Sequence, residues 1–285
     1  MATTPSKAVL ITGCSTGIGR ATALHLAARG FPVYATARRL DAIADLGSRG
    51  CRTLQLDVCD ETSMAAAVKT VEATEGAVGV LVNNAGYGLE GAFETTPMAD
   101  VRRQFETNVF GLIRLTQLVL PAMRAQGWGK VVNVGSVGGV ITLPGGAFYH
   151  ATKHAVEALS DALRFEVRGF GVDVVLIQPG AIKTNFAVTV TKGVAAQGVT
   201  DGPYAAFNAE VVARMTDAFE GRLATFSGAP EDVARAIERA VTAKRPRTRY
   251  PVTAAAHLLI AMRRWLPDRA IDRFLTTQYT PPRPQ

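Results

Sequence analysis

The chain has 285 residues, of which 48% are hydrophobic and 19% charged, a balance that predicts a globular protein and excludes intrinsic disorder. No stretch of about 20 residues is apolar enough to span a bilayer. The first residues do not join a basic start to a long apolar run, so we predict no signal peptide. The three cysteines, Cys14, Cys51 and Cys59, show no metal-ligand spacing, so we expect free thiols in the reducing cytoplasm.

The net charge of +7 is unevenly distributed. Residues 244–285 carry nine basic and two acidic side chains, so the whole excess lies in this basic C-terminal segment. Nucleic-acid binding is disfavoured, because the basic residues are not interleaved with stacking aromatic side chains and no nucleic-acid module is visible. A peripheral contact between this segment and an anionic membrane is the alternative that the charge suggests.

Short apolar runs alternate with helical stretches as far as Gly180. The apolar runs predict strands at residues 8–11, 32–36, 52–56, 78–82, 130–134 and 172–177. Helical composition is found at residues 17–28, 100–126 and 147–168. Strands without polar alternation are buried on both faces, and their alternation with helices favours parallel pairing through right-handed crossovers. We therefore predict an α/β fold, a doubly wound parallel sheet (Rossmann fold) of about seven strands with helices on both faces.

The pattern changes after Gly180. Residues 181–228 contain no clear strand, and apolar residues recur at helical spacing between Tyr204 and Phe219. We interpret 181–228 as a mobile insertion with one amphipathic helix that covers the substrate, because ligands bind beyond the carboxyl ends of such strands. Further helices are predicted from Pro230 and over 254–266. The expected organisation is one domain, 1–285, with a cofactor-binding and catalytic core at 6–180.

A glycine-rich turn joins the first strand to the first helix, with the sequence Thr12-Gly13-Cys14-Ser15-Thr16-Gly17-Ile18-Gly19. Glycines let the backbone approach a pyrophosphate closely, and the helix N-terminus offers it free N–H groups and a positive dipole end. The spacing, G-x-x-x-G-x-G, differs from the commoner G-x-G-x-x-G, and an ordinary structural turn is the alternative. Its position between a strand and a helix favours dinucleotide binding.

The end of the second strand bears on the choice of cofactor. NAD enzymes often carry an acid there that binds the ribose hydroxyls, whereas this chain has Ala37 followed by Arg38 and Arg39. An arginine binds a 2′-phosphate through charge-assisted hydrogen bonds, and an acid would repel it. We predict NADP(H) as the preferred cofactor over NAD(H), with Arg38 as the main contact. The alternative is that both arginines are solvated surface residues.

Tyr149 and Lys153 lie four residues apart in a predicted helix, which places the phenol and the ammonium group on one face. A phenol has a pKa near ~10, and a nearby ammonium group lowers that pKa because it favours the phenolate. A fall of ~3 units would let the phenol act as a general acid or base at neutral pH. A half-buried tyrosine beside a solvated lysine is the alternative for this pair taken alone.

Taken together, these residues resemble the short-chain dehydrogenase/reductase family in its shorter, single-domain branch. The resemblance covers about residues 6–185 and includes Asp57-Val58, Asn83-Asn84-Ala85-Gly86 and Pro179-Gly180. The predicted cofactor-binding residues are Gly13, Ser15, Thr16, Gly17, Ile18, Gly19, Arg38, Arg39, Asp57, Val58, Asn84, Ala85, Gly86, Tyr149, Lys153, Pro179, Gly180 and Thr184. Asp57 alone would also fit a cap of the following helix.

The resemblance further implies a catalytic group of Asn108, Ser136, Tyr149 and Lys153. In this family's mechanism Ser136 would donate a hydrogen bond to the substrate oxygen. Tyr149 would give a proton to that oxygen in reduction or remove it in oxidation. Lys153 would lower the pKa of Tyr149 and hold the nicotinamide ribose, and Asn108 would position a water molecule. Taken alone, Ser136 fits a turn residue and Asn108 a helix cap or kink.

The expected substrate is a hydrophobic ketone, aldehyde or alcohol of sterol, retinoid or long-chain type. The run from Tyr34 to Arg38 most resembles members that act on steroids or retinoids. Apolar residues of the insertion predict an apolar pocket, unless they are ordinary core; they are Phe186, Val188, Val190, Tyr204, Phe207 and Met215. The helices around 100–126 and 149–168 are apolar on more than one face, which predicts a homodimer or homotetramer.

Two other classes of protein remain as alternatives. A non-catalytic NADP(H)-sensing protein has no need of Ser136, Tyr149 and Lys153 together. An epimerase or dehydratase that retains its nicotinamide is usually longer than this chain. No metal site is predicted, because His150 and His154 lie four residues apart without a recognisable third ligand.

Overall fold

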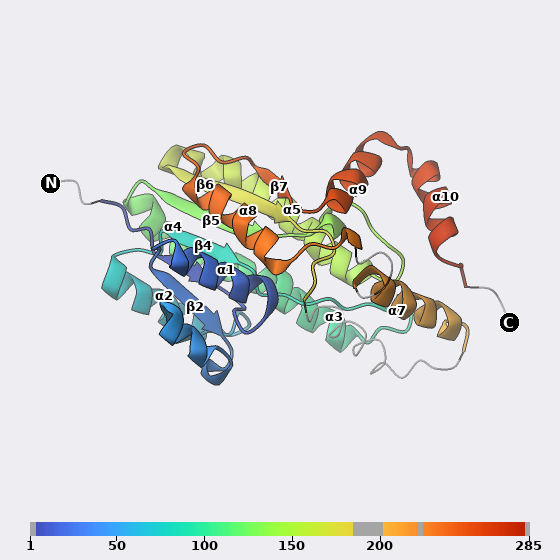
Figure 1. The fold of residues 1–285 in the computed structure, drawn as a ribbon, viewed down its shortest axis with the longest axis horizontal. Coiled ribbons are helices and arrows are strands. Elements are labelled where there is room, and N and C mark those ends of the chain that lie inside the picture. Colours follow the sequence, from blue (N-terminus) through green and yellow to red (C-terminus); the bar gives the residue numbers. More distant parts are fainter. Residues whose placement is uncertain (1–3, 185–201, 220, 222–224, 283–285) are drawn as a thin grey trace.

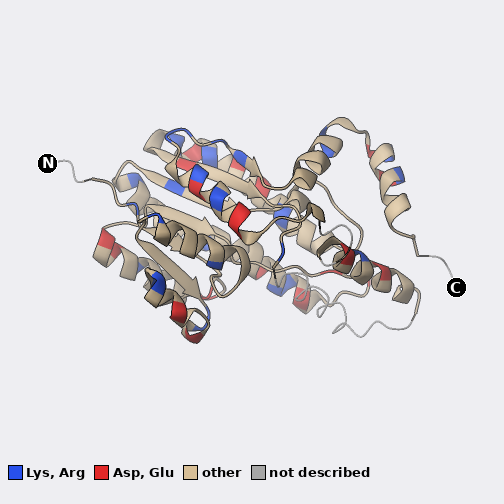
Figure 2. Cartoon of the chain, in the orientation of Figure 1, with Lys and Arg blue, Asp and Glu red and all other residues tan. Residues whose placement is uncertain are grey.

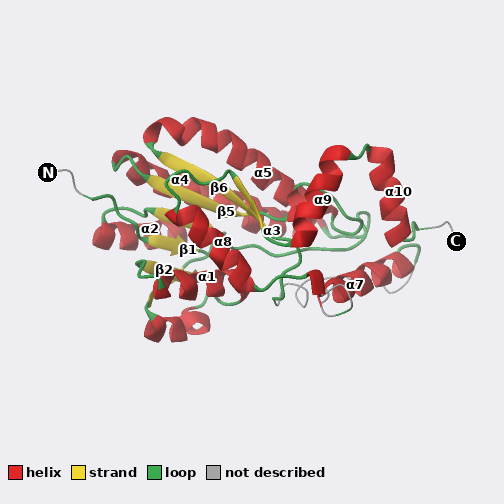
Figure 3. Ribbon diagram, turned by 45° about the horizontal axis from the view of Figure 1, so that its top comes forward, coloured by secondary structure: helices red, strands yellow, loops and turns green. Residues whose placement is uncertain are grey.

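A computed structural model of the protein describes residues 4–184, 202–219, 221 and 225–282. Its centre is a seven-stranded sheet with the order β3-β2-β1-β4-β5-β6-β7, in which every neighbouring pair is parallel. The strands are β1 (Val9–Ile11), β2 (Val33–Ala37), β3 (Cys51–Gln55), β4 (Val80–Asn83), β5 (Gly129–Val134), β6 (Val172–Gln178) and β7 (Arg249–Pro251). This arrangement confirms the predicted doubly wound sheet (Figures 1 and 3).

Helices follow the strands on both faces of the sheet. The described α-helices are α1 (Gly17–Ala28), α2 (Glu61–Glu75), α3 (Met98–Phe105), α4 (Gly111–Ala125), α5 (Ala147–Val167), α7 (Ala205–Phe219), α8 (Pro230–Thr242), α9 (Ala254–Trp265) and α10 (Asp268–Gln278). Shorter helical turns are η1 (Leu40–Arg49), η2 (Glu106–Phe110), η3 (Val137–Gly139) and η4 (Arg168–Phe170). None of the described helices is both long and apolar enough to cross a bilayer.

The alternation of side chains along each strand creates two cores. Val9 and Ile11 of β1 pack with residues of α1 and α8 on one face of the sheet. Leu10 packs with residues of α2 and α4 on the other face. All three side chains are fully buried, and burying one such side chain stabilises the fold by about 1.5–3 kcal/mol. The continuous apolar runs of the sequence therefore reflect a sheet that is covered on both sides.

Several features differ from the sequence prediction, among them α2, whose residues were not among the predicted helical ranges. β7 was not predicted as a strand, because it has three residues, contains Pro251 and pairs with β6 at the edge of the sheet. α10 lies in the basic C-terminal segment, for which the sequence predicted a helix only over 254–266. The helix predicted over 100–126 is interrupted by η2, a π-turn that inserts one widened turn between α3 and α4.

Candidate active site

The ends of four neighbouring strands bring the predicted site residues to one edge of the sheet. The turn after β1 carries the glycines, Asn84 to Gly86 follow β4, Ser136 follows β5 and Pro179 follows β6. The backbone N–H of Val137 donates to the Pro179 carbonyl oxygen at 2.9 Å, which fastens the loop after β5 to the turn after β6. Parallel pairing accounts for this clustering, because the carboxyl ends of parallel strands share one edge.

Three glycines shape the turn between β1 and α1. Gly13 and Gly17 have φ angles of 73° and 59°, in the left-handed region that favours glycine. A Cβ atom on Gly19 would lie 2.4 Å from the Gly13 carbonyl oxygen, so a side chain does not fit there. Thr16 precedes α1 without a side-chain capping bond, which leaves the first N–H groups of the helix to another acceptor. This geometry fits a pyrophosphate group.

Two residues from other loops contact the glycine turn. Asn84 Nδ2 donates to the Thr12 carbonyl oxygen at 2.8 Å and to the Gly13 carbonyl oxygen at 3.2 Å. Thr184 lies against Gly17, where an added Cβ atom would be 3.1 Å from its Cγ2. The loops after β1, β4 and β6 therefore form one cradle from residues that are far apart in the sequence.

The two arginines after β2 differ in their surroundings. Both are exposed. Arg39 forms an ion pair with Asp41, with a shortest N–O distance of 3.2 Å. Arg38 accepts a hydrogen bond at its carbonyl oxygen from Gln55 Nε2 at 3.1 Å, and within the described part of the chain its guanidinium group forms no ion pair. Arg38 thus differs from Arg39 in having no ion pair among the described residues.

Asp57 does not cap the next helix, because Asp60 does so. The Asp60 carboxylate accepts from the N–H groups of Thr62 and Ser63 at the start of α2. Asp57 Oδ1 instead accepts from the Cys59 N–H at 3.0 Å, which holds the turn after β3. The capping alternative is therefore wrong, and one carboxylate oxygen of Asp57 is committed to the turn.

Ser136, Tyr149 and Lys153 converge at the end of β5. Ser136 Oγ accepts from the Gly138 N–H at 3.0 Å, and its side chain hydrogen bonds to the Tyr149 phenol. Lys153 lies one turn further along α5, as the i, i+4 spacing predicts. Its Nζ donates to the Val134 carbonyl oxygen at 2.9 Å and lies 5.8 Å from the centroid of the Tyr149 ring.

The pKa values of this group correct one expectation. Burial raises the pKa of Tyr149 to about 12, against the opposing effect of the hydrogen bond from Ser136. Burial also lowers the pKa of Lys153 to about 8. The sequence predicted a lowered pKa for Tyr149, which is wrong for this structure because desolvation disfavours the phenolate more than its surroundings favour it. At neutral pH the phenol is therefore protonated.

Asn108 lies in the π-turn η2 and ties it to its neighbours. Its Oδ1 accepts from the Tyr87 N–H at 3.1 Å, and its Nδ2 donates to the Tyr87 carbonyl oxygen at 2.9 Å and to Thr152 Oγ1 at 3.1 Å. A Cβ atom on Gly86 would lie 3.0 Å from Asn108 Oδ1 and 3.9 Å from Lys153 Nζ. The predicted kink and the predicted catalytic position thus coincide at one residue.

Sequence reasoning missed Glu90. Its side chain is buried, which raises the pKa of its carboxyl group to about 8. A Cβ atom added to Gly146, the residue before α5, would lie 2.7 Å from Glu90 Oε2. The same Cβ atom would also contact the His150 ring. The charge of Glu90 raises the pKa of Tyr149. A lone glutamate in a glycine-containing loop gives no periodic signal, so only the fold reveals its burial.

The two histidines of α5 make other contacts. Burial lowers the pKa of His150 to about 4, so its ring is neutral, and its Nδ1 accepts from the Leu143 N–H at 3.0 Å. His154 Nδ1 lies 2.9 Å from the His150 carbonyl oxygen. Across the residues that the structure describes, no three His, Cys, Asp or Glu side chains are grouped to hold a metal ion.

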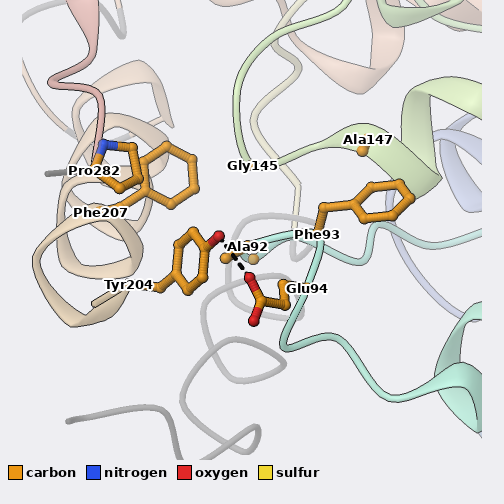
Figure 4. Close-up of a pocket in the computed structure, with 9 residues that line it drawn as sticks. Ala92, Phe93, Glu94, Gly145, Ala147, Tyr204, Phe207 and Pro282 are labelled. Carbon is orange, nitrogen blue, oxygen red and sulfur yellow. Dashed lines mark hydrogen bonds between the residues drawn. The ribbon is translucent and has the colours of Figure 1, made fainter. Parts of the chain in front are cut away.

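A cavity of about 390 Å³ lies near this edge (Figure 4). Its lining consists of Gly91, Ala92, Phe93, Glu94, Gly145, Ala147, Tyr204, Phe207 and Pro282. Tyr204 and Phe207 belong to the predicted pocket residues, whereas Met215 does not line it and Phe186, Val188 and Val190 lie outside the described residues. Pro282, from the segment after α10, was not expected. The Tyr204 hydroxyl donates to Glu94 Oε2 at 2.8 Å.

The fold, the glycine cradle and the serine–tyrosine–lysine group define the class of protein, a nicotinamide-dependent oxidoreductase. The family model described as short chain dehydrogenase matches residues 7–195. The chain belongs to the short-chain dehydrogenase/reductase family, NAD(P)-dependent enzymes that act on CH–OH groups.

Curated relatives and a solved structure support this assignment. The chain is 37% identical to the uncharacterized oxidoreductase YbbO of Escherichia coli over 94% of both chains. It is 35% identical to an NADPH-dependent 3-dehydrocapnine reductase of Ornithobacterium rhinotracheale, covering 93% of this chain and 94% of the relative. Human 17-beta-hydroxysteroid dehydrogenase type 1 is 36% identical, covering 95% and 84%. A short-chain dehydrogenase from Streptomyces avermitilis has a TM-score of 0.78, 34% identity and coverage of 95% and 96%.

Proposed function

We propose that the protein transfers a hydride between NADP(H) and a hydrophobic ketone, aldehyde or alcohol of sterol, retinoid or long-chain type. The observation that carries this proposal is the convergence of Ser136, Tyr149 and Lys153 beside the glycine cradle. A sensing protein gains nothing from this group, because cofactor binding alone does not need a hydroxyl donor next to a buried phenol.

Each side chain has a role that follows from its contacts. Ser136 donates to the substrate oxygen, where negative charge grows during reduction. In reduction Tyr149, protonated at neutral pH, gives its proton to the same oxygen. In oxidation the phenolate form of Tyr149 accepts the proton of the alcohol. Lys153 holds a positive charge within one helical turn of the phenol. Asn108 fixes the loop after β4 to α5 and so positions the group.

The residues that would hold the cofactor come from the cradle and its neighbours. The N-terminus of α1 with Gly13, Gly17 and Gly19 suits the pyrophosphate. When bound, the nicotinamide supplies or accepts the hydride. The free guanidinium group of Arg38 supports a preference for a 2′-phosphate, as does the relative named as NADPH-dependent.

The cavity supports the proposed substrate class. Phe93, Tyr204 and Phe207 give it an aromatic lining, and its polar group, Glu94, is bonded to Tyr204. An apolar lining with few polar groups favours a hydrophobic ligand. The relative named as a hydroxysteroid dehydrogenase supports a sterol-like substrate.

The test is an absorbance assay at the reduced-nicotinamide band with both cofactors and a panel of apolar carbonyls, apolar alcohols and small polar sugars. We expect turnover with NADPH and an apolar ketone, loss of turnover in Tyr149→Phe, and unchanged NADPH binding in that variant. Equal activity on sugars would reject the substrate class. Unchanged turnover in Tyr149→Phe would reject the mechanism, and conversion of substrate without net NADPH consumption would favour an epimerase or dehydratase.

We also propose a two-fold dimer or a tetramer in the cytoplasm. Phe110, Phe165 and Phe170 are exposed by 51%, 84% and 47%, close to the ends of α4 and α5. Exposed aromatic side chains at the ends of these helices support a contact between copies. Light scattering of the wild type and of Phe165→Ser tests this proposal. A wild-type protein that is monomeric would contradict it.

A further inference from the structure

α9 carries an exposed apolar stripe on its outer side. Leu258, Ala261 and Trp265 follow one another at helical spacing and are all exposed, Leu258 by 62% and Trp265 by 77%. Leu266, the next residue, is exposed by 38%. Of the twelve residues of α9 only Ala256 is buried, so the helix touches the body of the protein along a narrow line. Figure 1 shows α9 and α10 projecting beyond the sheet.

Arginines flank this apolar stripe. Arg263 and Arg264 lie in the last turn of α9, and Arg269 and Arg273 lie on α10 (Figure 2). The Arg264 guanidinium lies 5.6 Å from the Trp265 ring centroid, so both side chains leave the helix at the same place. Arg263 is paired with Asp268 at 2.8 Å. Arg249, earlier in the basic C-terminal segment, is instead held by Glu157 and Asp161 of α5.

We propose that this docking surface, formed by Leu258, Ala261, Trp265, Leu266 and the arginines of α9 and α10, binds the surface of a membrane that contains anionic phospholipid. A helix with Leu and Trp on one face and Arg beside them inserts its apolar face at the headgroup boundary. Tryptophan favours this boundary, and each arginine near an anionic surface adds attraction.

A second copy of this chain is the other occupant to consider. A two-fold interface brings the same patch of each copy together. Arg263, Arg264 and their counterparts would then face one another around the apolar stripe, and Asp268 is already paired with Arg263. Such an interface would bury like charges, whereas an anionic lipid surface neutralises them. The charge of the docking surface therefore favours the membrane.

The segment that forms the docking surface continues to one wall of the cavity. After α10 the Thr280 N–H donates to Glu210 Oε2 of α7 at 2.9 Å, and Pro282 lines the cavity. A membrane bound at α9 therefore contacts the segment that forms part of the cavity wall. Membrane binding itself needs neither cofactor nor substrate, so it stands apart from the proposed reaction and can be measured without turnover.

Trp265 is the probe for this proposal. The chain has two tryptophans, and Trp128→Phe leaves Trp265 as the sole tryptophan. We expect its emission to move to shorter wavelength with vesicles of phosphatidylcholine and phosphatidylglycerol, at low salt more than at high salt. Co-sedimentation with these vesicles should be at least about 10-fold stronger than with pure phosphatidylcholine, and Arg263→Gln/Arg264→Gln should remove most of that difference.

Two variants of the full-length protein complete the test. Leu258→Ser/Trp265→Ser should abolish vesicle binding, whereas Met98→Ser, which replaces an apolar residue of α3 that is exposed by 55%, should not. The proposal is overturned if the wild type ignores anionic vesicles or binds both vesicle types equally. It is also overturned if Leu258→Ser/Trp265→Ser changes the oligomeric state in the absence of lipid, which would identify the surface as a contact between copies.

Discussion

Lys153 Nζ lies 5.8 Å from the centroid of the Tyr149 ring and donates to the Val134 carbonyl oxygen at 2.9 Å. One backbone group at the end of β5 therefore fixes the position of the ammonium group relative to the phenol. Burial moves the two pKa values apart, down to about 8 for Lys153 and up to about 12 for Tyr149. The sheet and α5 together hold the two side chains in place. α5 alone would not provide the contact between Lys153 and the Val134 carbonyl oxygen.

The ammonium group of Lys153 carries a stability cost that depends on pH. Its pKa is about 8 in the folded protein and ~10.4 when unfolded, so between these values the unfolded chain binds more protons. Stability should therefore rise with pH across this window, and the cost of charging the buried lysine is complete below pH 8. Lys153→Met should flatten the dependence of Tm on pH between 8 and 10, while turnover falls by ~10²-fold or more.

Thermal unfolding at several pH values checks this, with Lys69→Met as the control. Lys69 lies on the exposed side of α2. Its replacement should leave the slope of Tm against pH as in the wild type. A slope that is the same in wild type and Lys153→Met would contradict the assignment.

Ser136→Ala should lower kcat without weakening cofactor binding. The change removes the hydrogen bond to Tyr149 and the donor to the substrate oxygen. Loss of one such donor costs about 10²–10³-fold in kcat. Ser136→Thr keeps a hydroxyl group and should recover part of the loss. Steady-state kinetics with NADPH titrated by fluorescence separates the two effects, and an unchanged kcat in Ser136→Ala would exclude this role.

Arg38→Asp should shift the cofactor preference toward NADH. Loss of a charged hydrogen bond worth ~1.5–3 kcal/mol corresponds to a fall of about 10- to 100-fold in kcat/KM for NADPH. The value for NADH should stay constant or rise, because it has no 2′-phosphate for the acid to repel. Arg39→Asp is the matched control, since Arg39 is already paired with Asp41, and should change the ratio much less. Equal effects of both substitutions would place the phosphate elsewhere.

Gly19→Ala tests the cradle itself. A Cβ atom at this position would lie 2.4 Å from the Gly13 carbonyl oxygen, so the turn must shift. Overpacking of this kind costs about 1–3 kcal/mol, and we expect a lower Tm together with at least ~10-fold weaker NADPH binding. Gly47→Ala adds a methyl group where no atom lies within 4 Å, and should change neither quantity. Normal binding in Gly19→Ala would show that the turn does not hold the cofactor.

The strands and the glycine turn were predictable because their signals are local. Val9 to Ile11 are buried on both faces, which leaves an unbroken apolar run, and Gly13 with φ of 73° needs the residue type that the sequence shows. The i, i+4 spacing placed Tyr149 and Lys153 one turn apart for the same reason. These inferences need only the period of a helix or a strand.

Burial by distant segments could not be predicted. The pKa of Tyr149 depends on desolvation, which spacing along α5 does not reveal, so its direction was predicted wrongly. Pro282 reaches the cavity through α9 and α10, whose path is set by tertiary packing. β7 is a short edge strand that only its pairing with β6 identifies. Each of these features depends on contacts between residues that are far apart in the chain.

Glu90 should make the protein less stable as pH rises through neutrality. Its pKa is about 8 in the folded protein and ~4.3 when unfolded, so between these values the folded protein binds more protons. Stability contributed by the neutral carboxyl group is complete below pH 4 and is lost as pH rises to 8. Glu90→Gln keeps a neutral side chain of similar shape, so its Tm at pH 8.5 should exceed that of the wild type by ~2–4 °C for each kcal/mol removed, with little difference near pH 4.5.

The same substitution should change the reaction. The charge of Glu90 raises the pKa of Tyr149, so the alkaline limb of the kcat profile should move to lower pH in Glu90→Gln. Glu166→Gln, on the exposed side of α5, is the control and should alter neither the profile nor the stability curve. If the wild-type Tm were flat between pH 5 and 8.5, or if Glu90→Gln followed it at every pH, the buried carboxyl group would not titrate in this range. A shift in both measurements would identify Glu90 as a group that acts on catalysis through Tyr149 without itself exchanging the substrate proton.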